Sequence, residues 1–194
     1  MNYLAHAFLS NQNAAHLVGN FMADHWRGNN FQNLPMEVVE GIRLHRKIDS
    51  FTDSHREFKK SKRVFYSGFE KYSGILVDIY FDHLLARQFL RYSSTSLEVF
   101  SEKAYSIYLE HREILPESGA EFLDHVVMNN LYEAYAKLEN VELALKRLSL
   151  RTKHGVQLEN SLRLFTEKET ELVRNFEVFF EEAMQLFMPA TRSS

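Results

Sequence analysis

The stretch Gly74-Ile75-Leu76-Val77-Asp78-Ile79-Tyr80-Phe81-Asp82-His83-Leu84-Leu85-Ala86 decides the fold. Its apolar residues cover nearly every face of a helix, and a helix of this kind is expected to be buried on all sides. The whole chain of 194 residues contains only 7 glycines and 3 prolines. So few turn formers cannot punctuate the many short strands of a β-sandwich or barrel. We therefore expect an all-α fold, a single-domain helical bundle.

Helix signals recur along the rest of the chain, and they predict seven to nine helices in all. Helices are expected at residues 2–9, 13–27 with Asn13 as the N-terminal cap, 36–57 with Pro35 in the first turn, 72–91, and from Asn140 to about 151. Three more helix starts have the capping-box spacing of Ser or Thr followed by Glu, at Thr95, Ser118 and Thr166. In the last helix, near 166–187, apolar residues recur at helical spacing and indicate core packing: Leu172, Phe176, Phe179, Phe180, Met184 and Phe187.

The composition excludes several classes of protein. The chain contains no cysteine, which excludes disulfides, thiol nucleophiles and zinc sites with sulfur ligands. Its formal net charge of -3 does not favour a nucleic-acid partner. No apolar run approaches the roughly 18–20 residues of a membrane span, so no membrane partner is expected. Without cysteines or a basic signal segment at the N-terminus, a soluble cytoplasmic protein is the default expectation.

Two carboxylates and a histidine interrupt the buried stretch. Asp78 and Asp82 lie four residues apart, about 40° from one another around a helix, and His83 follows directly. A buried ionised carboxylate must be paired, hydrogen-bonded, neutralised or bound to a metal. The chemical interpretation is a metal or catalytic site, and the structural alternative is an ion pair or a helix cap.

A second group of such residues lies in the helix expected at 36–57. His45, Asp49 and Asp53 recur every four residues and therefore share one helix face. A His and an Asp one turn apart are suited to be two metal ligands, or a ligand and the carboxylate that orients it. The alternative is ordinary pairing of surface side chains.

Two further candidates precede this helix. Asp24 lies near the end of an apolar helix, and His6 lies on a short apolar helix, where a lone histidine is more often part of the core. Five other histidines show no partnered pattern and are interpreted as structural or surface residues: His16, His25, His111, His125 and His154.

Histidine and carboxylate ligands without thiolates suit Mn²⁺, Mg²⁺, Fe²⁺ or Zn²⁺. A metal in such a site polarises a phosphoryl oxygen and lowers the pKa of a bound water, which is what phosphoester hydrolysis requires. The sequence contains no P-loop, G-x-G-x-x-G, H-E-x-x-H or G-x-S-x-G motif.

Four ordered motifs resemble the acyl carrier protein phosphodiesterase family. They are Asn2-Tyr3-Leu4-Ala5-His6, Gly19-Asn20-Phe21 with Asp24, Gly41-Ile42-x-Leu44-His45-Arg46-x-Ile48-Asp49-x-Phe51-Thr52-Asp53, and Asp78 with Asp82-His83. The resemblance is strong over residues 1–90 and looser up to about 155. It implies one domain over residues 1–194, with a motif-bearing core at 1–91 and a helical remainder at 92–194.

The resemblance implies a cytoplasmic hydrolase that removes 4′-phosphopantetheine from the serine of holo acyl carrier protein and leaves the apo carrier. It also implies an all-α, metal-dependent fold, an atypical branch of the HD phosphohydrolases, with Mn²⁺ preferred. HD enzymes place His before Asp, whereas this chain has Asp82-His83, the reverse order.

The predicted site combines the residues and the resemblance. Asp24, His45, Asp82 and His83 are the predicted metal ligands, with His6 and Asp49 next. Arg46 is predicted to neutralise the phosphodiester, because a guanidinium matches phosphate oxygens. Asp78 is a candidate base, a water-orienting group, or a residue that supports the metal ligands from behind. Asp24 is predicted to be catalytic as well as a metal ligand.

Residues 56–63 form a basic segment whose predicted role depends on the resemblance. Its basic residues are Arg56, Lys59, Lys60, Lys62 and Arg63. By itself the segment is interpreted as a solvated helical face. For an acidic carrier protein as partner, it is predicted to form a docking surface near the site.

Two alternative functions stay open from the sequence. The first is a metal-dependent phosphohydrolase that acts on a nucleotide or another small phosphoester. The second is a non-catalytic helical module that binds a carrier protein, in which the His and Asp clusters are structural. A ferritin-like di-iron bundle is less favoured, because such sites use Glu and Glu-x-x-His.

Overall fold

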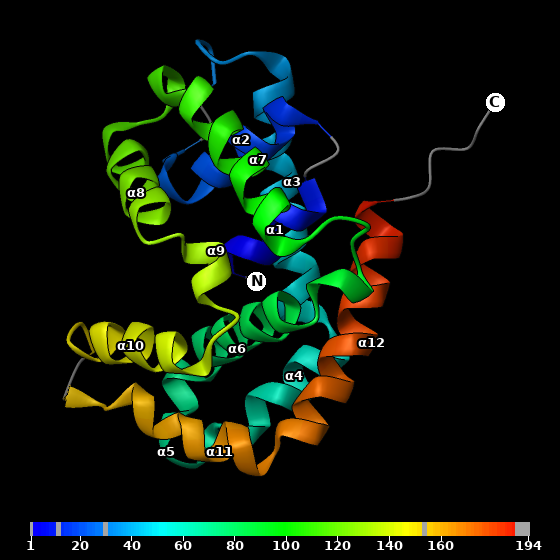
Figure 1. The fold of residues 1–194 in the computed structure, drawn as a ribbon, viewed down its shortest axis with the longest axis vertical. Coiled ribbons are helices and arrows are strands. Elements are labelled where there is room, and N and C mark those ends of the chain that lie inside the picture. Colours follow the sequence, from blue (N-terminus) through cyan, green and yellow to red (C-terminus); the bar gives the residue numbers. More distant parts are fainter. Residues whose placement is uncertain (1, 11–12, 29–30, 153–154, 189–194) are drawn as a thin grey trace.

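The computed structural model describes residues 2–10, 13–28, 31–152 and 155–188, and these residues form helices and no strand (Figure 1). The longer helices are α1 (Tyr3–Ser10), α2 (Ala14–Met22), α3 (Met36–Ser54), α4 (Arg56–Val64), α6 (Ser73–Arg87), α7 (Leu97–Glu110), α8 (Glu117–Met128), α10 (Leu138–Ser149) and α12 (Glu169–Phe187). Shorter segments are α5 (Tyr66–Phe69), α9 (Leu131–Ala134) and α11 (Ser161–Glu167), with 3-10 turns at η1 (Ala23–His25), η2 (Glu70–Tyr72), η3 (Phe89–Arg91), η4 (Arg112–Ile114) and η6 (Leu158–Asn160). The buried residues of these helices form one core, so the expected single all-α domain is confirmed.

Helix α6 lies at the centre of this core, as its apolar composition predicts. Leu76, Val77, Tyr80 and Leu84 are all fully buried. The helix packs against α1, α4, α10 and α12. The aromatic ring of Tyr80 stacks on that of Phe165, with centroids 4.4 Å apart. The stretch from which the fold was inferred therefore organises the helices around it.

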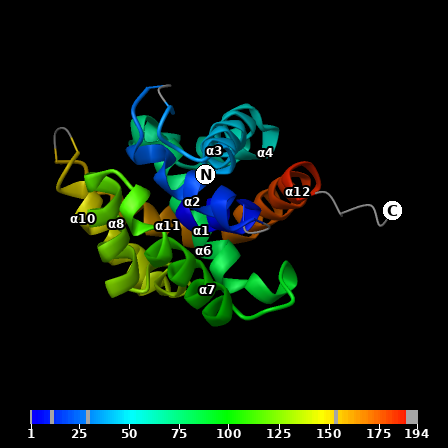
Figure 2. The same ribbon diagram turned by 90° about the horizontal axis from the view of Figure 1, so that it is seen from above.

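The phenylalanine stripe of α12 packs against this centre. The rings of Phe176 and Phe179 each lie 5.3 Å from the ring of Phe81 in α6. Both views of the ribbon place α12 and α4 on one side of the molecule and α8 and α10 on the other (Figures 1 and 2). The stripe is core packing, as predicted.

Helices α2 and α3 cross with their backbones in contact, and two glycines make this possible. A Cβ atom on Gly19 would lie 2.0 Å from the carbonyl oxygen of Val38, and one on Gly41 would lie 2.4 Å from that of His16. No side chain larger than hydrogen fits at either position. The close crossing brings the last turn of α2 next to the middle of α3.

Three expected helices end earlier than predicted. The one expected at 72–91 ends at Arg87, before the separate 3-10 turn η3. The helix expected at 36–57 ends at Ser54, because His55 adopts an extended conformation and its ring accepts a hydrogen bond from the backbone nitrogen of Glu57. His55 thereby caps α4, the separate helix that carries the basic segment. The helix expected to reach residue 27 ends at Met22 and continues as a single 3-10 turn, η1.

The cap of α2 is confirmed, and four other predicted starts are displaced. Asn13 accepts a hydrogen bond from the backbone nitrogen of His16. Helix α7 is capped by Ser96 instead of Thr95, α8 begins directly after Pro116, α10 begins at Leu138, and α12 begins at Glu169. In α8 the preceding proline sets the start, because its fixed φ is compatible with the residue before a helix.

Among the described residues, no helix is both long enough and apolar enough to cross a lipid bilayer.

Candidate functional site

Three helical elements bring two imidazoles and two carboxylates together. His6 Nε2 in α1 lies 3.0 Å from Asp49 Oδ1, and His45 Nε2 in α3 lies 3.0 Å from Asp49 Oδ2. Asp24 Oδ1, in the turn after α2, lies 3.2 Å from His45 Nε2. The two rings stack with their centroids 4.1 Å apart. His6, Asp24, His45 and Asp49 are called the His–Asp cluster below.

Asn20 orients His45 from the opposite side of the ring. Its Oδ1 lies 2.9 Å from His45 Nδ1 and accepts that proton, while its amide nitrogen lies 3.4 Å from the carbonyl oxygen of His6. Because Nδ1 is used in this way, Nε2 is the atom that faces both carboxylates. The contact between Gly19 and Gly41 holds the helices of Asn20 and His45 close enough for this hydrogen bond.

Asn20 is not among the site residues predicted from the sequence. Its position in an apolar helix could have indicated a role, because a buried amide must find a hydrogen-bonding partner, and Asn20 is fully buried in the structure.

The cluster separates the pKa values of its two histidines. Burial opposes protonation of His45, but the hydrogen bonds to Asp24 and Asp49 outweigh it and raise the pKa of His45 to about 9. Burial dominates at His6 and lowers its pKa to about 4 despite the hydrogen bond to Asp49. Burial acts against the ionised form of Asp49, but hydrogen bonds to both histidines hold its pKa well below the usual range. The metal-free cluster at neutral pH therefore contains one imidazolium, one neutral imidazole and two carboxylates.

A cavity of about 150 Å³ borders the cluster. His6, Asp24 and His45 line it together with Asp78 of α6. Burial raises the pKa of Asp78. The histidine side chains are less than one-tenth exposed, whereas those of Asp24 and Asp49 are 50% and 43% exposed, so the carboxylates form the side of the cluster that is open to solvent.

The structure does not bring Asp82 and His83 into the cluster. Both carboxylate oxygens of Asp82 accept backbone hydrogen bonds from the first turn of α1, from the nitrogens of Leu4 at 2.8 Å and Ala5 at 3.0 Å. Burial raises the pKa of Asp82 to about 7 even though both hydrogen bonds lower it. This arrangement corresponds to the helix cap that was the alternative for Asp82. His83 lies about one-quarter of a turn around α6 from Asp82. Its Nδ1 lies 2.7 Å from the carbonyl oxygen of Tyr135.

The predicted basic residues also lie away from the cavity lining. Arg46 donates a hydrogen bond to the carbonyl oxygen of Gly28 and lies over the ring of Phe31. In the basic segment, Arg56 and Lys60 both form ion pairs with Glu57. None of the five basic residues of α4 lines the cavity.

Most of the other histidines behave as structural or surface residues, as predicted. The ring of His16 lies 3.3 Å from Glu40, that of His25 lies 3.3 Å from Ser118, and that of His111 lies 2.9 Å from the carbonyl oxygen of Ile107. Asn129 contacts the ring of His125. His154 lies outside the described residues.

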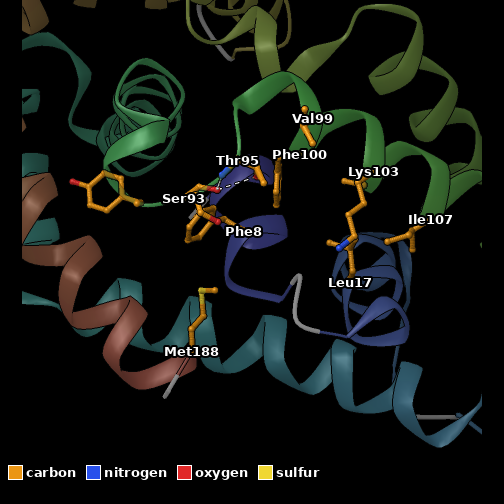
Figure 3. Close-up of a pocket in the computed structure, with 12 residues that line it drawn as sticks. Phe8, Leu17, Ser93, Thr95, Val99, Phe100, Lys103, Ile107 and Met188 are labelled. Carbon is orange, nitrogen blue, oxygen red and sulfur yellow. Dashed lines mark hydrogen bonds between the residues drawn. The ribbon is translucent and has the colours of Figure 1, made fainter. Parts of the chain in front are cut away.

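A second and larger cavity is lined by residues of α1, α2 and α7 (Figure 3). It measures about 300 Å³ and is lined mainly by apolar side chains such as Phe8, Leu17 and Phe100. Its polar groups are the amine of Lys103 and the hydroxyls of Tyr92, Ser93, Ser94 and Thr95, of which Figure 3 labels Lys103, Ser93 and Thr95. Its described lining contains no histidine and no carboxylate, so it lacks the groups that hydrolysis of a phosphoester needs.

The donor atoms of the His–Asp cluster fit a divalent metal. Atoms of His6, His45 and Asp49 lie within 4.8 Å of one another, and an Asp24 oxygen adjoins them. With both imidazoles neutral, the two carboxylates carry two negative charges, which a divalent cation balances. Nitrogen and oxygen ligands without sulfur suit Mn²⁺, Fe²⁺ or Zn²⁺. The hydrogen bond from His45 Nδ1 to Asn20 is the kind of outer contact that orients a histidine ligand.

Metal-free protein is expected to lose stability as the pH rises above neutral. The folded pKa of His45 is about 9 and its ordinary value is 6.5, so the folded state retains a proton that the unfolded chain releases. The retained proton adds at most about 3 kcal/mol to the free energy of unfolding. This stabilisation is fully present below pH 6.5 and is lost as the pH rises through 9. Urea unfolding in a chelator at several pH values measures it. The variant His45→Gln should show a flatter pH dependence, and an unchanged slope would contradict the assignment to His45.

Fold and site together define an all-α protein with two imidazoles and two carboxylates gathered beside one cavity. The chain belongs to the acyl carrier protein phosphodiesterase family: the sequence model of that family matches residues 1–183. This membership confirms both the resemblance inferred from the motifs and the expectation of a hydrolase.

Relatives of that name cover most of the chain. The protein from Pectobacterium atrosepticum is 33% identical over 187 residues, which are 96% of this chain and 97% of the relative. The protein from Serratia proteamaculans is 29% identical over 186 residues, 95% and 96% of the two chains. The protein from Photorhabdus laumondii is 33% identical over 152 residues, 78% and 77% of the two chains. No solved structure matches the chain.

Proposed function

We propose that this protein hydrolyses the phosphodiester of holo acyl carrier protein with a divalent metal, releasing 4′-phosphopantetheine and leaving the carrier with a free serine. The carrier as substrate follows the name that its relatives share. The observation that carries the metal dependence is the His–Asp cluster, with two imidazoles and two carboxylates at one cavity. Mn²⁺ is the proposed metal, because it accepts this mixture of nitrogen and oxygen ligands.

The cluster residues have separate roles in this proposal. His6, His45 and Asp49 hold the metal, and the exposed Asp24 completes the set on its solvent side. When bound, the metal supplies positive charge that makes the phosphorus more susceptible to attack by water. The neighbouring histidines are buried, so the substrate approaches from the side of the carboxylates.

Asp78 is proposed to move a proton during the reaction. It lines the same cavity as the cluster, and burial raises its pKa. A carboxyl group with a raised pKa accepts a proton from the attacking water more readily than an exposed aspartate. It is then able to return that proton to the serine oxygen as the ester bond breaks.

Holo carrier incubated with the protein and Mn²⁺ is expected to lose the mass of 4′-phosphopantetheine, as measured by mass spectrometry of the intact carrier. A chelator should stop the reaction and added Mn²⁺ should restore it. Nucleotides and small phosphomonoesters serve as the substrate control, since their hydrolysis in place of the carrier would favour a general phosphohydrolase. A carrier that retains its prosthetic group would contradict the proposal.

A further inference from the structure

A groove continues from the cluster cavity toward α10. It measures about 280 Å³, and it shares Asn2, Tyr3 and Ile75 with the cavity of the His–Asp cluster. Further along, its lining comes from α6, α8, α9 and α10, and the ribbon views show α8 and α10 together on the side away from α12 (Figures 1 and 2). Because the two spaces have common walls, a molecule that reacts at the cluster can extend into the groove.

The lining of the groove is apolar along its walls and basic at one edge. Ile79 of α6, Leu131 of α9 and Leu148 of α10 provide apolar surface. Arg147 and Arg151 are the cationic side chains of this lining. Arg147 lies in the last turn of α10 and Arg151 follows the end of that helix, four residues further on, and both line the groove, which suits them to bind one anionic group together.

Arg151 acts electrostatically on the end of the groove nearest the cluster. Burial is the main cause that raises the pKa of Tyr3 to about 12, Asp24 adds to the rise, and Arg151 opposes it. The Tyr3 phenol is thus influenced by a cluster carboxylate and by Arg151 at once. Among the described residues, neither Arg147 nor Arg151 forms an ion pair within 4 Å, unlike Arg56 and Lys60 of the basic segment.

We infer that this groove binds the 4′-phosphopantetheine arm of the substrate, with Arg151 beside the phosphate and Arg147 supporting it. The inference rests on the proposed function. The arm has one anionic group at the reacting end, and the rest of it is an uncharged chain of methyl, methylene, hydroxyl and amide groups that ends in a thiol. That order matches a groove with two arginines, of which Arg151 acts on Tyr3 beside the cluster, and with mainly apolar and aromatic side chains elsewhere, whereas an acidic protein surface would require cations along the whole length.

Titration of the protein with free 4′-phosphopantetheine in the presence of Mn²⁺ tests the inference by calorimetry. Arg151→Gln is expected to weaken binding by roughly tenfold, because it removes a charge-assisted hydrogen bond. Ala144→Trp, which fills the groove from α10, should weaken binding by roughly tenfold or more. Arg174→Gln is the matched control, an exposed arginine on α12 on the other side of the molecule, and should bind like the unaltered protein.

Hydrolysis of holo carrier by the same variants separates this inference from the proposed function. Arg151→Gln should raise KM for the carrier by roughly tenfold. Ala144→Trp should impair hydrolysis of the carrier more than hydrolysis of bis(p-nitrophenyl) phosphate, because the latter substrate has no such arm. Absence of carrier hydrolysis by the unaltered protein would contradict the proposed function, and the calorimetric titration would still test the groove. Equal binding by the unaltered protein, Arg151→Gln and Ala144→Trp would overturn the inference even if hydrolysis occurs. Because Arg151 is exposed, its variant remains informative if Ala144→Trp does not fold.

Discussion

His45→Gln is expected to lower the turnover of holo carrier by at least roughly one hundredfold at saturating Mn²⁺. The reason is the central position of His45 Nε2, which lies within 3.2 Å of both Asp24 and Asp49. Glutamine retains hydrogen-bonding capacity but does not offer an imidazole nitrogen to a metal. Asp24→Asn should cause a loss of similar size, because it removes one of the two negative charges of the cluster.

The control for this prediction is His16→Gln. His16 is also a histidine that contacts a carboxylate, that of Glu40, but it lies on the outer part of α2. Its replacement should leave turnover unchanged, and circular dichroism should show native helix content for all three variants. A loss below about tenfold in His45→Gln or Asp24→Asn would remove that residue from the metal-binding set.

Asp82→Ala is expected to lower the free energy of unfolding by roughly 2–5 kcal/mol. Asp82 is fully buried and accepts hydrogen bonds from the backbone nitrogens of Leu4 and Ala5. Alanine would leave both N–H groups without their acceptor in the interior, and the first turn of α1 would lose its anchor. Urea denaturation measures the difference, and Asp53→Ala, an exposed aspartate of α3, should change stability by no more than about 0.5 kcal/mol.

Asp82→Asn distinguishes a cap from a metal ligand. Asparagine keeps one acceptor oxygen and should retain part of the stability. If Asp82 only caps α1, the folded variant should bind Mn²⁺ as tightly as the unaltered protein. If it is a ligand, as the sequence alone suggested, the Mn²⁺ affinity should fall by roughly tenfold or more while the stability is less affected.

Much of the site was predictable because it depends on local spacing. His45 and Asp49 lie four residues apart, and a helix places such residues on one face whatever surrounds them. The burial of α6 followed from its uniform apolar composition. These predictions needed only the periodicity of a helix and the cost of exposing apolar surface.

The role of Asp82 was not predictable in the same way. A buried carboxylate requires partners, and its sequence position does not identify them. The partners of Asp82 are backbone groups 78 and 77 residues away along the chain. His83 likewise meets a carbonyl oxygen from a distant turn. Tertiary contacts of this kind decide between a ligand and a cap, and they leave no spacing pattern.

Several predicted helix boundaries were wrong for a related reason. The break after Ser54 depends on the side chain of His55, which caps α4 and also lies 3.1 Å from Glu182 of α12. Thr166 has the spacing of a cap, but in the structure its hydroxyl donates to the carbonyl oxygen of Leu162 inside α11. The same short polar side chain fits several local hydrogen bonds, and packing selects among them.

The contact between Gly19 and Gly41 has a mechanical consequence. Most helix interfaces contain a layer of side chains that can change rotamer and take up small displacements. At this crossing the backbones themselves meet, so the spacing has a fixed lower limit that no rotamer change can alter. Substitutions elsewhere in the core therefore cannot bring α2 and α3 closer together, whereas a Cβ at Gly19 or Gly41 would force the two helices apart and separate Asn20 from His45.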